Sequence, residues 1–216
     1  MKSCISSASN IEIGGYIKFG KYMHNSTNHN KDDIEWLILD IKDNEALIIS
    51  KYALDCKKFH SYTTSVAWKE CTIREWLNGV FFNAAFSDVE KSAIVSVEIM
   101  SNKKANFNEI STYITRDNVF LLSINEAITY LVSDYARQCK PTNYATTQGA
   151  FVNDSTGFCW WWLRSQGDNQ YDASYVYTSG YICKHGHNVR DDFTCVRPAI
   201  RININIFNSL RTACIA

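Results

Sequence analysis

Three side chains near the C-terminus, Cys183, His185 and His187, alternate along the chain and are of the types that bind transition metals. Alternate residues of a β-strand project from one face, so on a strand they would converge as one thiolate and two imidazoles, a set suited to zinc or copper. Gly180 and Gly186 instead indicate a turn, which would scatter the three side chains. A closed zinc site also needs a fourth ligand. We therefore expect no metal and no cofactor.

Other patterns that carry chemistry are absent from the sequence. It contains no Gly-x-Ser-x-Gly elbow, no His-Glu-x-x-His helix, no Gly-Lys-Ser phosphate loop and no dinucleotide glycine pattern. The neighbouring acids Asp32-Asp33 and Asp191-Asp192 would point apart on a strand, and such pairs are typical of solvated turns rather than of paired catalytic carboxylates. We predict no catalytic residue and a protein that is not an enzyme.

Cysteine usage indicates reduced thiols. The eight cysteines would suit a disulfide framework in a small secreted domain, but this chain has 216 residues, no apolar leader and no Cys-x-x-Cys pair. We expect most of the thiols to be packed as small apolar groups.

Charge and hydropathy limit the partners and the location. The 22 basic and 22 acidic residues are interspersed, so no basic face is available for a phosphate backbone and we expect no nucleic-acid partner. The apolar runs are too short for a membrane span. Without a secretory signal the expected location is cytoplasmic, and display on a cell surface or phage particle stays open.

The run from Gln166 to Phe193 has the composition of a contact surface, rich in Tyr, Asp, Ser, Asn, His and Gly and poor in aliphatic residues. Tyrosine offers a large contact area at low entropic cost and small polar residues adapt their hydrogen bonds, as in antibody paratopes. The alternative is an ordinary polar loop region. The residues predicted to bind a ligand are Asp168, Asn169, Tyr171, Asp172, Ser174, Tyr175, Tyr177, Ser179, Tyr181, His185, His187, Asn188, Arg190, Asp191 and Phe193.

Three consecutive tryptophans precede this run. On a strand Trp161 would face one side while Trp160 and Trp162 face the other. Other parts of the protein must therefore pack against both faces of the strand. We interpret all three as core scaffold, with Arg164 and Arg197 as scaffold residues that bridge loop carbonyls and acids. An aromatic ligand shelf is the alternative for the tryptophans.

Strands are expected in the first and last parts of the chain, where branched and aromatic residues gather between turn signals. Pro198 predicts a break, bulge or edge in the last of them. The expected strands are 16–20, 34–41, 46–50, 160–165, 174–177, 181–183 and 194–203.

Helices are expected in the middle of the chain, where Ser or Thr is followed three residues later by Glu, the pattern of a capping box. The three boxes begin at Thr72, Ser87 and Ser123. The expected buried face of the first helix is Ile73, Trp76, Leu77 and Val80, and that of the third is Ile124, Ala127, Ile128 and Leu131. These elements indicate an α+β fold.

One domain is expected, because the chain has two prolines and no linker-like tract. We place it at residues 11–205, between an N-terminal tail at 1–10 and a C-terminal tail at 206–216.

Several motifs, taken in order, resemble a family of uncharacterised bacterial domains over residues 14–205. They are IKFG at 17–20, IEWLILD at 34–40, ALIISK at 46–51, TIREWLN at 72–78, VFLLS at 119–123, WWLRS at 161–165 and VRPAI at 196–200.

The resemblance implies a C-type lectin-like fold. Some members are similar to the variable target proteins of diversity-generating retroelements, in which a reverse transcriptase miscopies template adenines into the 3′ end of the gene. The variable region here would lie at 166–193, and adenine-derived codons yield the Asn, Asp, Tyr, His, Ser and Gly found there. The implied function is a non-catalytic recognition module for a protein or cell-surface ligand, without calcium, and a homo-oligomer or particle component is compatible with it.

Two positions depart from the family pattern. Gln166-Gly167 stands where Pro-Gly often follows Arg-Ser, and Cys195 stands where a glycine often precedes Val-Arg-Pro. The same fold also resembles formylglycine-generating enzymes, although no matching cysteine pair can be assigned. The alternative function is therefore a metal- or thiol-dependent enzyme that uses Cys183, His185, His187 or Cys195.

Overall fold

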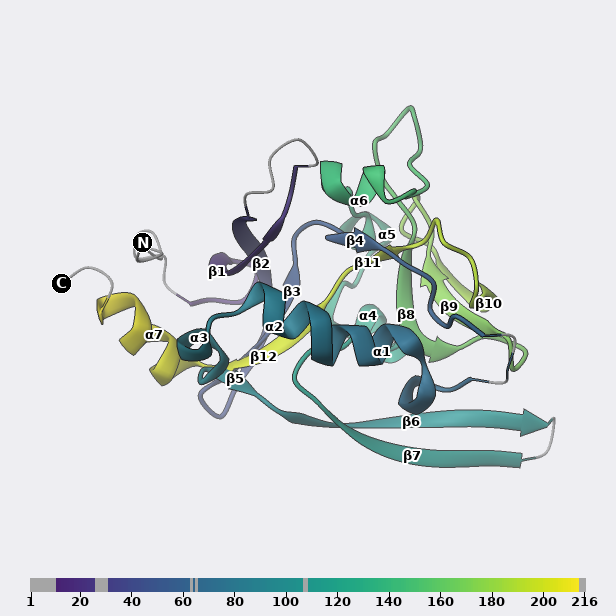
Figure 1. Ribbon diagram of the computed structural model, residues 1–216, viewed down its shortest axis with the longest axis horizontal. Helices are drawn as coiled ribbons and strands as arrows, with labels where there is room; N and C mark the ends of the chain where they lie inside the picture. The colour runs from purple at the N-terminus through teal and green to yellow at the C-terminus, as the bar shows by residue number, and fades with distance from the viewer. Residues whose placement is uncertain (1–10, 26–30, 63, 65, 107–108, 214–216) are drawn as a thin grey trace.

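The computed structural model describes residues 11–25, 31–62, 64, 66–106 and 109–213 (Figure 1). The expected N-terminal tail lies outside these residues. The described part is a mixed α+β structure of mostly antiparallel sheets and short helices, which confirms the predicted class.

The first sheet has the strand order β1-β2-β3-β12-β5 and is antiparallel throughout. Its strands are β1 (Tyr16–Met23), β2 (Lys31–Lys42), β3 (Glu45–Ser50), β12 (Ala199–Asn203) and β5 (Ile94–Val95). The predicted turn between β2 and β3 is present, and Asp43 and Asn44 both have positive φ angles there, as a two-residue hairpin turn requires. Buried aliphatic residues on β2 and β3 place this sheet in the core.

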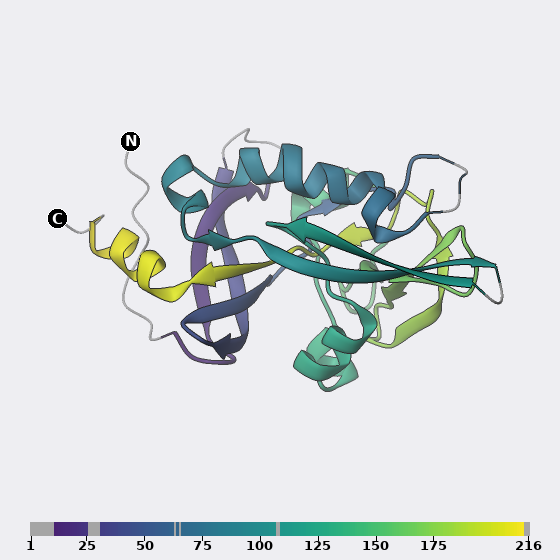
Figure 2. The ribbon, with the colours of Figure 1, turned by 90° about the horizontal axis from the view of Figure 1, so that it is seen from below.

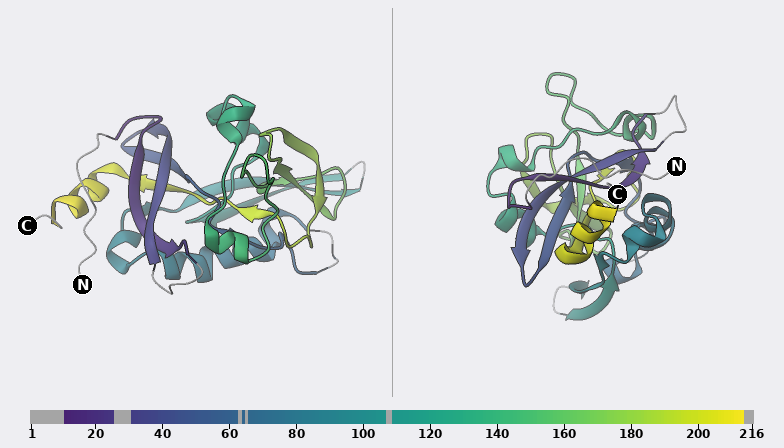
Figure 3. Two further views of the ribbon diagram at one scale, coloured as in Figure 1. Left: turned by 90° about the horizontal axis from the view of Figure 1, so that it is seen from above. Right: turned by 90° about the vertical axis from the view of Figure 1, so that its left-hand side faces the viewer.

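The second sheet has the order β10-β9-β8-β11-β4 and lies at the other end of the molecule (Figures 1 and 3). Its strands are β10 (Ile182–Asn188), β9 (Asp172–Val176), β8 (Trp161–Gln166), β11 (Cys195–Val196) and β4 (Asp55–Cys56). The predicted hairpin is β9–β10, closed by a turn in which Gly180 has a φ of 86°.

The predicted break at Pro198 is confirmed, and it separates two sheets. β11 pairs with β4 and β8 in the second sheet, whereas β12, three residues later, pairs with β3 and β5 in the first. Arg197 donates from Nε to the Ser50 carbonyl at 2.9 Å, and Ser50 donates its N–H to the Pro198 carbonyl at 2.9 Å. This short segment therefore joins the two sheets.

Helical segments and one long hairpin flank the sheets. Figure 2 shows the run from α1 to α2 along one side of the molecule, with the β6–β7 hairpin beside it. No described helix is long and apolar enough to cross a membrane. The bounds are η1 (Trp68–Glu70), α1 (Thr72–Trp76), the π-helical turn η2 (Leu77–Phe81), α2 (Phe82–Ala85), α3 (Asp88–Lys91), β6 (Val97–Asn106), β7 (Glu109–Asp117), α4 (Ile124–Tyr130), α5 (Asp134–Arg137), α6 (Asn143–Thr147) and α7 (Ile204–Ala213).

Two of the three predicted capping boxes are confirmed. Ser87 and Ser123 each accept the backbone N–H of the Glu three residues later, and each Glu accepts in return. The box at Thr72 is wrong, because helix α1 starts one residue earlier than predicted: Cys71 is the N-cap and Thr72 is already helical. The Thr72 hydroxyl instead contacts the Ser61 hydroxyl at 3.3 Å.

Two residues expected in buried helical faces are exposed. Val80 is 65% exposed and Ile128 is 45% exposed. Val80 lies in the π-helical turn η2, whose wider turn rotates the chain so that Phe81 is buried in its place. The C-terminal tail assigned to 206–216 begins inside helix α7, whose Phe207 is buried 5.6 Å from the ring of Phe19.

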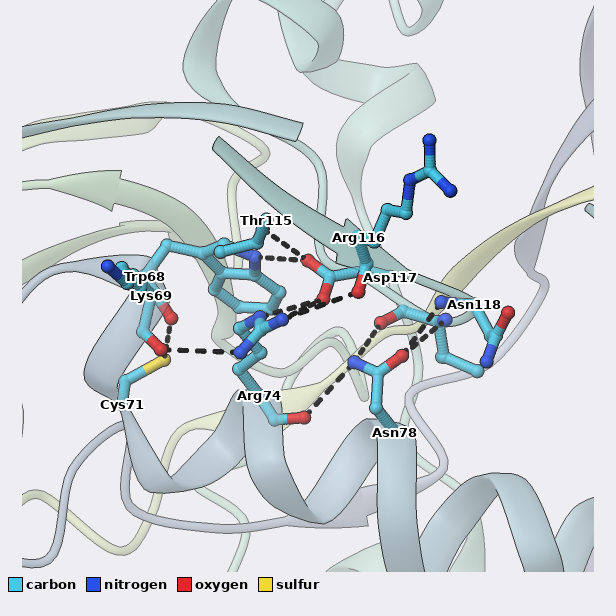
Figure 4. A network of polar contacts seen from close by, with 10 residues as sticks. Trp68, Lys69, Cys71, Arg74, Asn78, Thr115, Arg116, Asp117 and Asn118 are labelled. Carbon is cyan, nitrogen blue, oxygen red and sulfur yellow. Dashed lines mark hydrogen bonds and ion pairs between the residues drawn. The ribbon is translucent and has the colours of Figure 1, made fainter. Parts of the chain in front are cut away.

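A buried carboxylate attaches the helical run to the β6–β7 hairpin (Figure 4). Asp117 is fully buried and accepts from the Trp68 indole N–H at 2.7 Å, the Thr115 hydroxyl at 2.9 Å and the Arg74 Nε at 2.7 Å. Asn78 Oδ1 accepts the Asn118 N–H at 2.8 Å, and its amide donates to the Val119 carbonyl at 2.9 Å. Arg74 and Asn78 come from the TIREWLN motif, so this motif positions the scaffold.

We predict that Asp117→Asn lowers the free energy of unfolding by about 2–3 kcal/mol, because Arg74 then loses its counter-ion in a buried setting. Urea denaturation measures this. The matched control is Glu98→Gln, since Glu98 pairs with Arg116 where both side chains are mostly exposed. It should cost less than about 1 kcal/mol. Equal costs for the two variants would contradict the role given to Asp117.

Candidate ligand-binding surface

Two of the three tryptophans are core residues, as predicted. Trp161 and Trp162 are fully buried, and their indole N–H groups donate to the carbonyls of Arg137 at 3.0 Å and Lys57 at 2.9 Å. The Arg197 guanidinium lies 5.1 Å above the Trp161 ring. Trp162 instead lies against Tyr175, with ring centroids 6.2 Å apart. The indoles therefore pack against different partners, as neighbours on a strand should.

Trp160 is only partly buried, unlike its two neighbours. It precedes β8 and forms the centre of a set of rings that we call the Trp160 cluster. The centroids of all other members lie between 4.7 and 5.8 Å from that of Trp160. The cluster consists of Phe151, Trp160, Tyr175, Tyr177, His187 and Phe193.

Around Trp160 the cluster gathers side chains from four other parts of the chain. Phe151 follows α6, Tyr177 follows β9, His187 lies on β10 and Phe193 precedes β11. Phe151 is 43% exposed, and the other three are partly buried. Tyr181, 56% exposed, extends the cluster, with its centroid 6.1 Å from that of Tyr177. The result is a partly open aromatic surface whose buried member, Tyr175, packs against Trp162.

The predicted binding residues divide by exposure. Those presented on the surface of the β9–β10 region are Asp168, Asn169, Tyr171, Ser179, Tyr181, His185, Asn188 and Arg190. Those partly buried are Asp172, Tyr177, His187, Asp191 and Phe193.

Ser174 and Tyr175 are buried, at 0% and 2% exposure. They are consecutive residues in the middle of β9 and face opposite sides of the sheet, and the rings of Trp160, Trp162 and Tyr177 pack against Tyr175. The Ser174 hydroxyl donates to the Gln166 carbonyl at 3.2 Å. The prediction that both residues lie on the exposed contact surface is therefore wrong, because both are buried beneath that surface.

Polar residues within the loop that connects β8 to β9 hold that loop in place. Asn169 Oδ1 accepts the Tyr171 N–H at 2.8 Å, and the Asn169 amide donates to the Asp172 carboxylate. Gly167 is required where this loop crosses β10, because an added Cβ would lie 2.3 Å from the His185 carbonyl. The exposed pair of His185 and Asp168 contributes little to stability.

The candidate metal residues do not converge in the structure. The ladder between β9 and β10 is interrupted between Cys183 and His187, where Gly186 has a φ of 88°. Cys183 is buried, His185 pairs with Asp168, and His187 lies in the Trp160 cluster. Within the described part of the chain, no three His, Cys, Asp or Glu residues are grouped to hold a metal ion.

Four buried thiols, Cys56, Cys139, Cys159 and Cys195, lie close to one another at and beside the second sheet. The Cys159 thiol donates to the Cys139 carbonyl at 3.4 Å, and the Cys56 thiol donates to the Asp192 carbonyl at 3.0 Å. The neighbouring thiols and burial raise the pKa of Cys195. Burial opposes ionisation of Cys159, but the neighbouring thiols and the Arg197 charge outweigh it and lower its pKa to about 5. All four lie in the interior as free thiols, and the thiols named in the enzyme alternative, Cys183 and Cys195, are 7% and 0% exposed.

Cys195 replaces the family's glycine without backbone strain. It lies in β11, and Asp43 and Asn44 are the non-glycine residues that have positive φ angles in the described ranges. A glycine is therefore not needed at this position.

Two members of the cluster were missed or misassigned by sequence reasoning. Phe151 lies outside the run 166–193 and reaches Trp160 because Val152 bridges to Cys159. Trp160 was assigned to the core together with its neighbours. Apart from aromatic character, no local signal distinguishes these two residues, because the contacts depend on tertiary pairing.

We predict that His187 makes the folded state more sensitive to acid. The Asp191 carboxylate contacts the His187 ring and the Asp172 carboxylate acts to raise its pKa, but burial has the larger effect and lowers the pKa below the usual 6.5. Below that pH the unfolded chain binds a proton that the folded chain resists, so stability falls as pH falls. Burial lowers the pKa of His24 and His60 as well. The test therefore compares the acid-induced loss of stability between the variant and the unmodified protein. Urea denaturation at about pH 7.5 and about pH 5 should show a smaller acid loss in His187→Asn than in the unmodified protein.

The control for this measurement is His185→Asn, the same replacement at an exposed position of β10. An acid loss in His187→Asn that equals that of the unmodified protein would contradict the burial argument.

Fold and surface together define an α+β domain in which a two-sheet scaffold supports an aromatic surface with a polar rim. Residues 43–204 match the family model described as Domain of unknown function (DUF6273). The match covers well over half of the 216 residues, and the chain belongs to this family. The matched region contains the whole Trp160 cluster. No curated protein matches the chain, and no solved structure does.

Proposed function

We propose that this protein is a non-catalytic recognition module whose binding surface is the Trp160 cluster with the exposed residues of the β9–β10 region. The observation that carries the proposal is the partly open cluster itself, in which aromatic side chains from separated segments meet around Trp160. Aromatic groups gathered at one exposed place are characteristic of interaction sites on soluble proteins.

The physical properties of the cluster suit binding. Trp160 and Tyr177 offer large apolar areas and are already held by neighbouring rings, so little side-chain entropy remains to be lost when a partner binds. Trp161 and Trp162 fix the strand beneath them through hydrogen bonds to distant carbonyls. A surface held in this way is pre-organised.

The charges of the exposed residues favour a protein or cell-surface ligand over nucleic acid. The exposed charged residues within 166–193 are of both signs, with Lys184 and Arg190 on one hand and Asp168 and Asp192 on the other. A phosphate backbone would need a mainly basic face. Mixed polar groups around aromatic residues resemble the composition of antibody contact surfaces.

The finer part of the proposal is a C-type lectin-like scaffold whose residues 166–193 are diversified by a retroelement. Its support is the WWLRS and VRPA motifs and the surface-borne Asn, Asp, Tyr, His and Ser between them. Burial predicts which positions of that run vary in sequence: Ser174 and Tyr175 should stay constant, while their exposed neighbours vary. The surface also lies at the end of the molecule opposite α7 (Figure 1), where a partner would have access.

We predict that the double variant Tyr177→Ala/Tyr181→Ala loses binding to a genuine partner by about tenfold or more, because Tyr177 belongs to the cluster and the exposed Tyr181 extends it. The measurement is a screen of the full chain against arrayed glycans and bacterial surface proteins, followed by titration of every hit.

The matched control is Tyr62→Ala, which removes a tyrosine that is 64% exposed outside the cluster. It should bind like the unmodified protein. A hit that the double variant retains and Tyr62→Ala loses would refute the assignment of the surface. Tyr175→Ala is unsuitable for this test, because its cavity would cost about 3–5 kcal/mol of stability.

A further inference from the structure

A second concave site lies apart from the Trp160 cluster and shares no residue with it. It is a cavity of about 430 Å³ between the first sheet and the segment that joins α4 to α5. This volume falls in the range of small-molecule sites. The walls are largely apolar and include Leu39 and Leu131, both buried. Two tyrosines lie at its exposed side, Tyr16 at 48% and Tyr135 at 82% exposure.

Arg197 lines this cavity and carries an unmatched charge. The residue is 3% exposed, and its Nε donates to the Ser50 carbonyl. Its Nη1 is buried and has no hydrogen-bond partner among the described residues. No carboxylate in the described part of the chain forms an ion pair with it either.

An unmatched buried guanidinium is costly, because a buried charge needs an opposite charge or full hydrogen bonding to offset lost hydration. The Trp161 ring supplies one favourable contact at 5.1 Å. The Cys159 thiol interacts electrostatically with the Arg197 guanidinium but accepts no hydrogen bond from its Nη1. Nη1 itself is sealed from solvent, so an acceptor from outside the chain would approach the guanidinium from the side on which Arg197 lines the cavity.

The charge around the cavity favours an anion. Arg197 and Lys51 are the ionic residues in its lining, and the lining includes no Asp or Glu. Lys51 is already paired with Glu35 at 2.9 Å, which leaves Arg197 as the anchoring cation. Gln138 adds an uncharged polar group to the lining.

The cavity wall is held in place before any ligand arrives. Arg137 donates to the carbonyls of Leu131 and, at 2.8 Å, Gly180, while its own carbonyl accepts the Trp161 indole N–H. An added Cβ at Gly180 would lie 1.7 Å from the Asp134 carbonyl, so the β9–β10 turn packs closely against α5. The site is therefore largely pre-formed, as small-molecule sites usually are.

We propose that this cavity binds a small carboxylate with an apolar or aromatic body, its carboxylate accepting from Arg197 and its body lying between the aliphatic wall and the tyrosines. A bare inorganic anion would leave the apolar wall unused, and a neutral ligand would leave the guanidinium unmatched.

The test uses the full chain, labelled with nitrogen-15 and titrated with benzoate, its neutral counterpart benzamide, and inorganic phosphate. Benzoate should shift the resonances of Leu131, Gln138 and the Arg197 Nε–H, and bind about tenfold or more tightly than benzamide or phosphate. Ala136→Trp should weaken benzoate binding by about tenfold or more, because Ala136 lines the cavity and is itself exposed, so a large side chain fills the space without disturbing the core.

The matched control is Val132→Trp, the same bulky replacement at a position that is 79% exposed and outside the cavity lining. It should bind benzoate like the unmodified protein. Three results would overturn the proposal: benzamide binding as tightly as benzoate, phosphate binding as tightly as benzoate, or undiminished benzoate binding by Ala136→Trp. Absence of any shift with benzoate up to about 10 mM would overturn it as well.

Discussion

The indole N–H groups of Trp161 and Trp162 fix the strand on which the second sheet is built. Each donates to a main-chain carbonyl far away in the sequence, one at Arg137 and one at Lys57, while the rings are fully buried. A buried indole without such a partner would lose the hydrogen bond it made with water and gain none in return. The burial of these two residues therefore requires that the segments carrying both carbonyls be in place. β8 is the central strand of its sheet, so the positions of β9, β10 and the Trp160 cluster follow from it.

The same strand connects the two sites that we describe. Trp160, just before β8, is the centre of the exposed aromatic cluster. Trp161, the next residue, covers the guanidinium of Arg197 beside the cavity. Arg197 in turn precedes Pro198, where the chain passes from the second sheet into the first. One run of tryptophans thus supports a surface on one side and a buried charge on the other.

Local patterns predicted those parts of the fold that local interactions determine. The β2–β3 hairpin and the boxes at Ser87 and Ser123 follow from residues within a few positions of each other. The shift at Val80 depends on a π-helical turn, and the exposure of Trp160 and burial of Tyr175 depend on which strands lie beside them. The cavity has no signal in the sequence, because its lining residues Lys51, Leu131 and Arg197 meet only in the folded chain. Composition thus indicated the region of the candidate surface, while tertiary pairing decided which of its residues are presented.

The proposed diversification of the run between the WWLRS and VRPA motifs is tested most directly by sequencing of the DNA around the gene. The proposal predicts a near-copy of the codons for residues 160–201 beside a reverse transcriptase gene. The two copies should differ at adenines, in codons for exposed residues such as Tyr171, Tyr181 and Asn188, and agree at the buried Ser174 and Tyr175. Absence of such a copy, or differences spread equally over buried and exposed codons, would contradict the account.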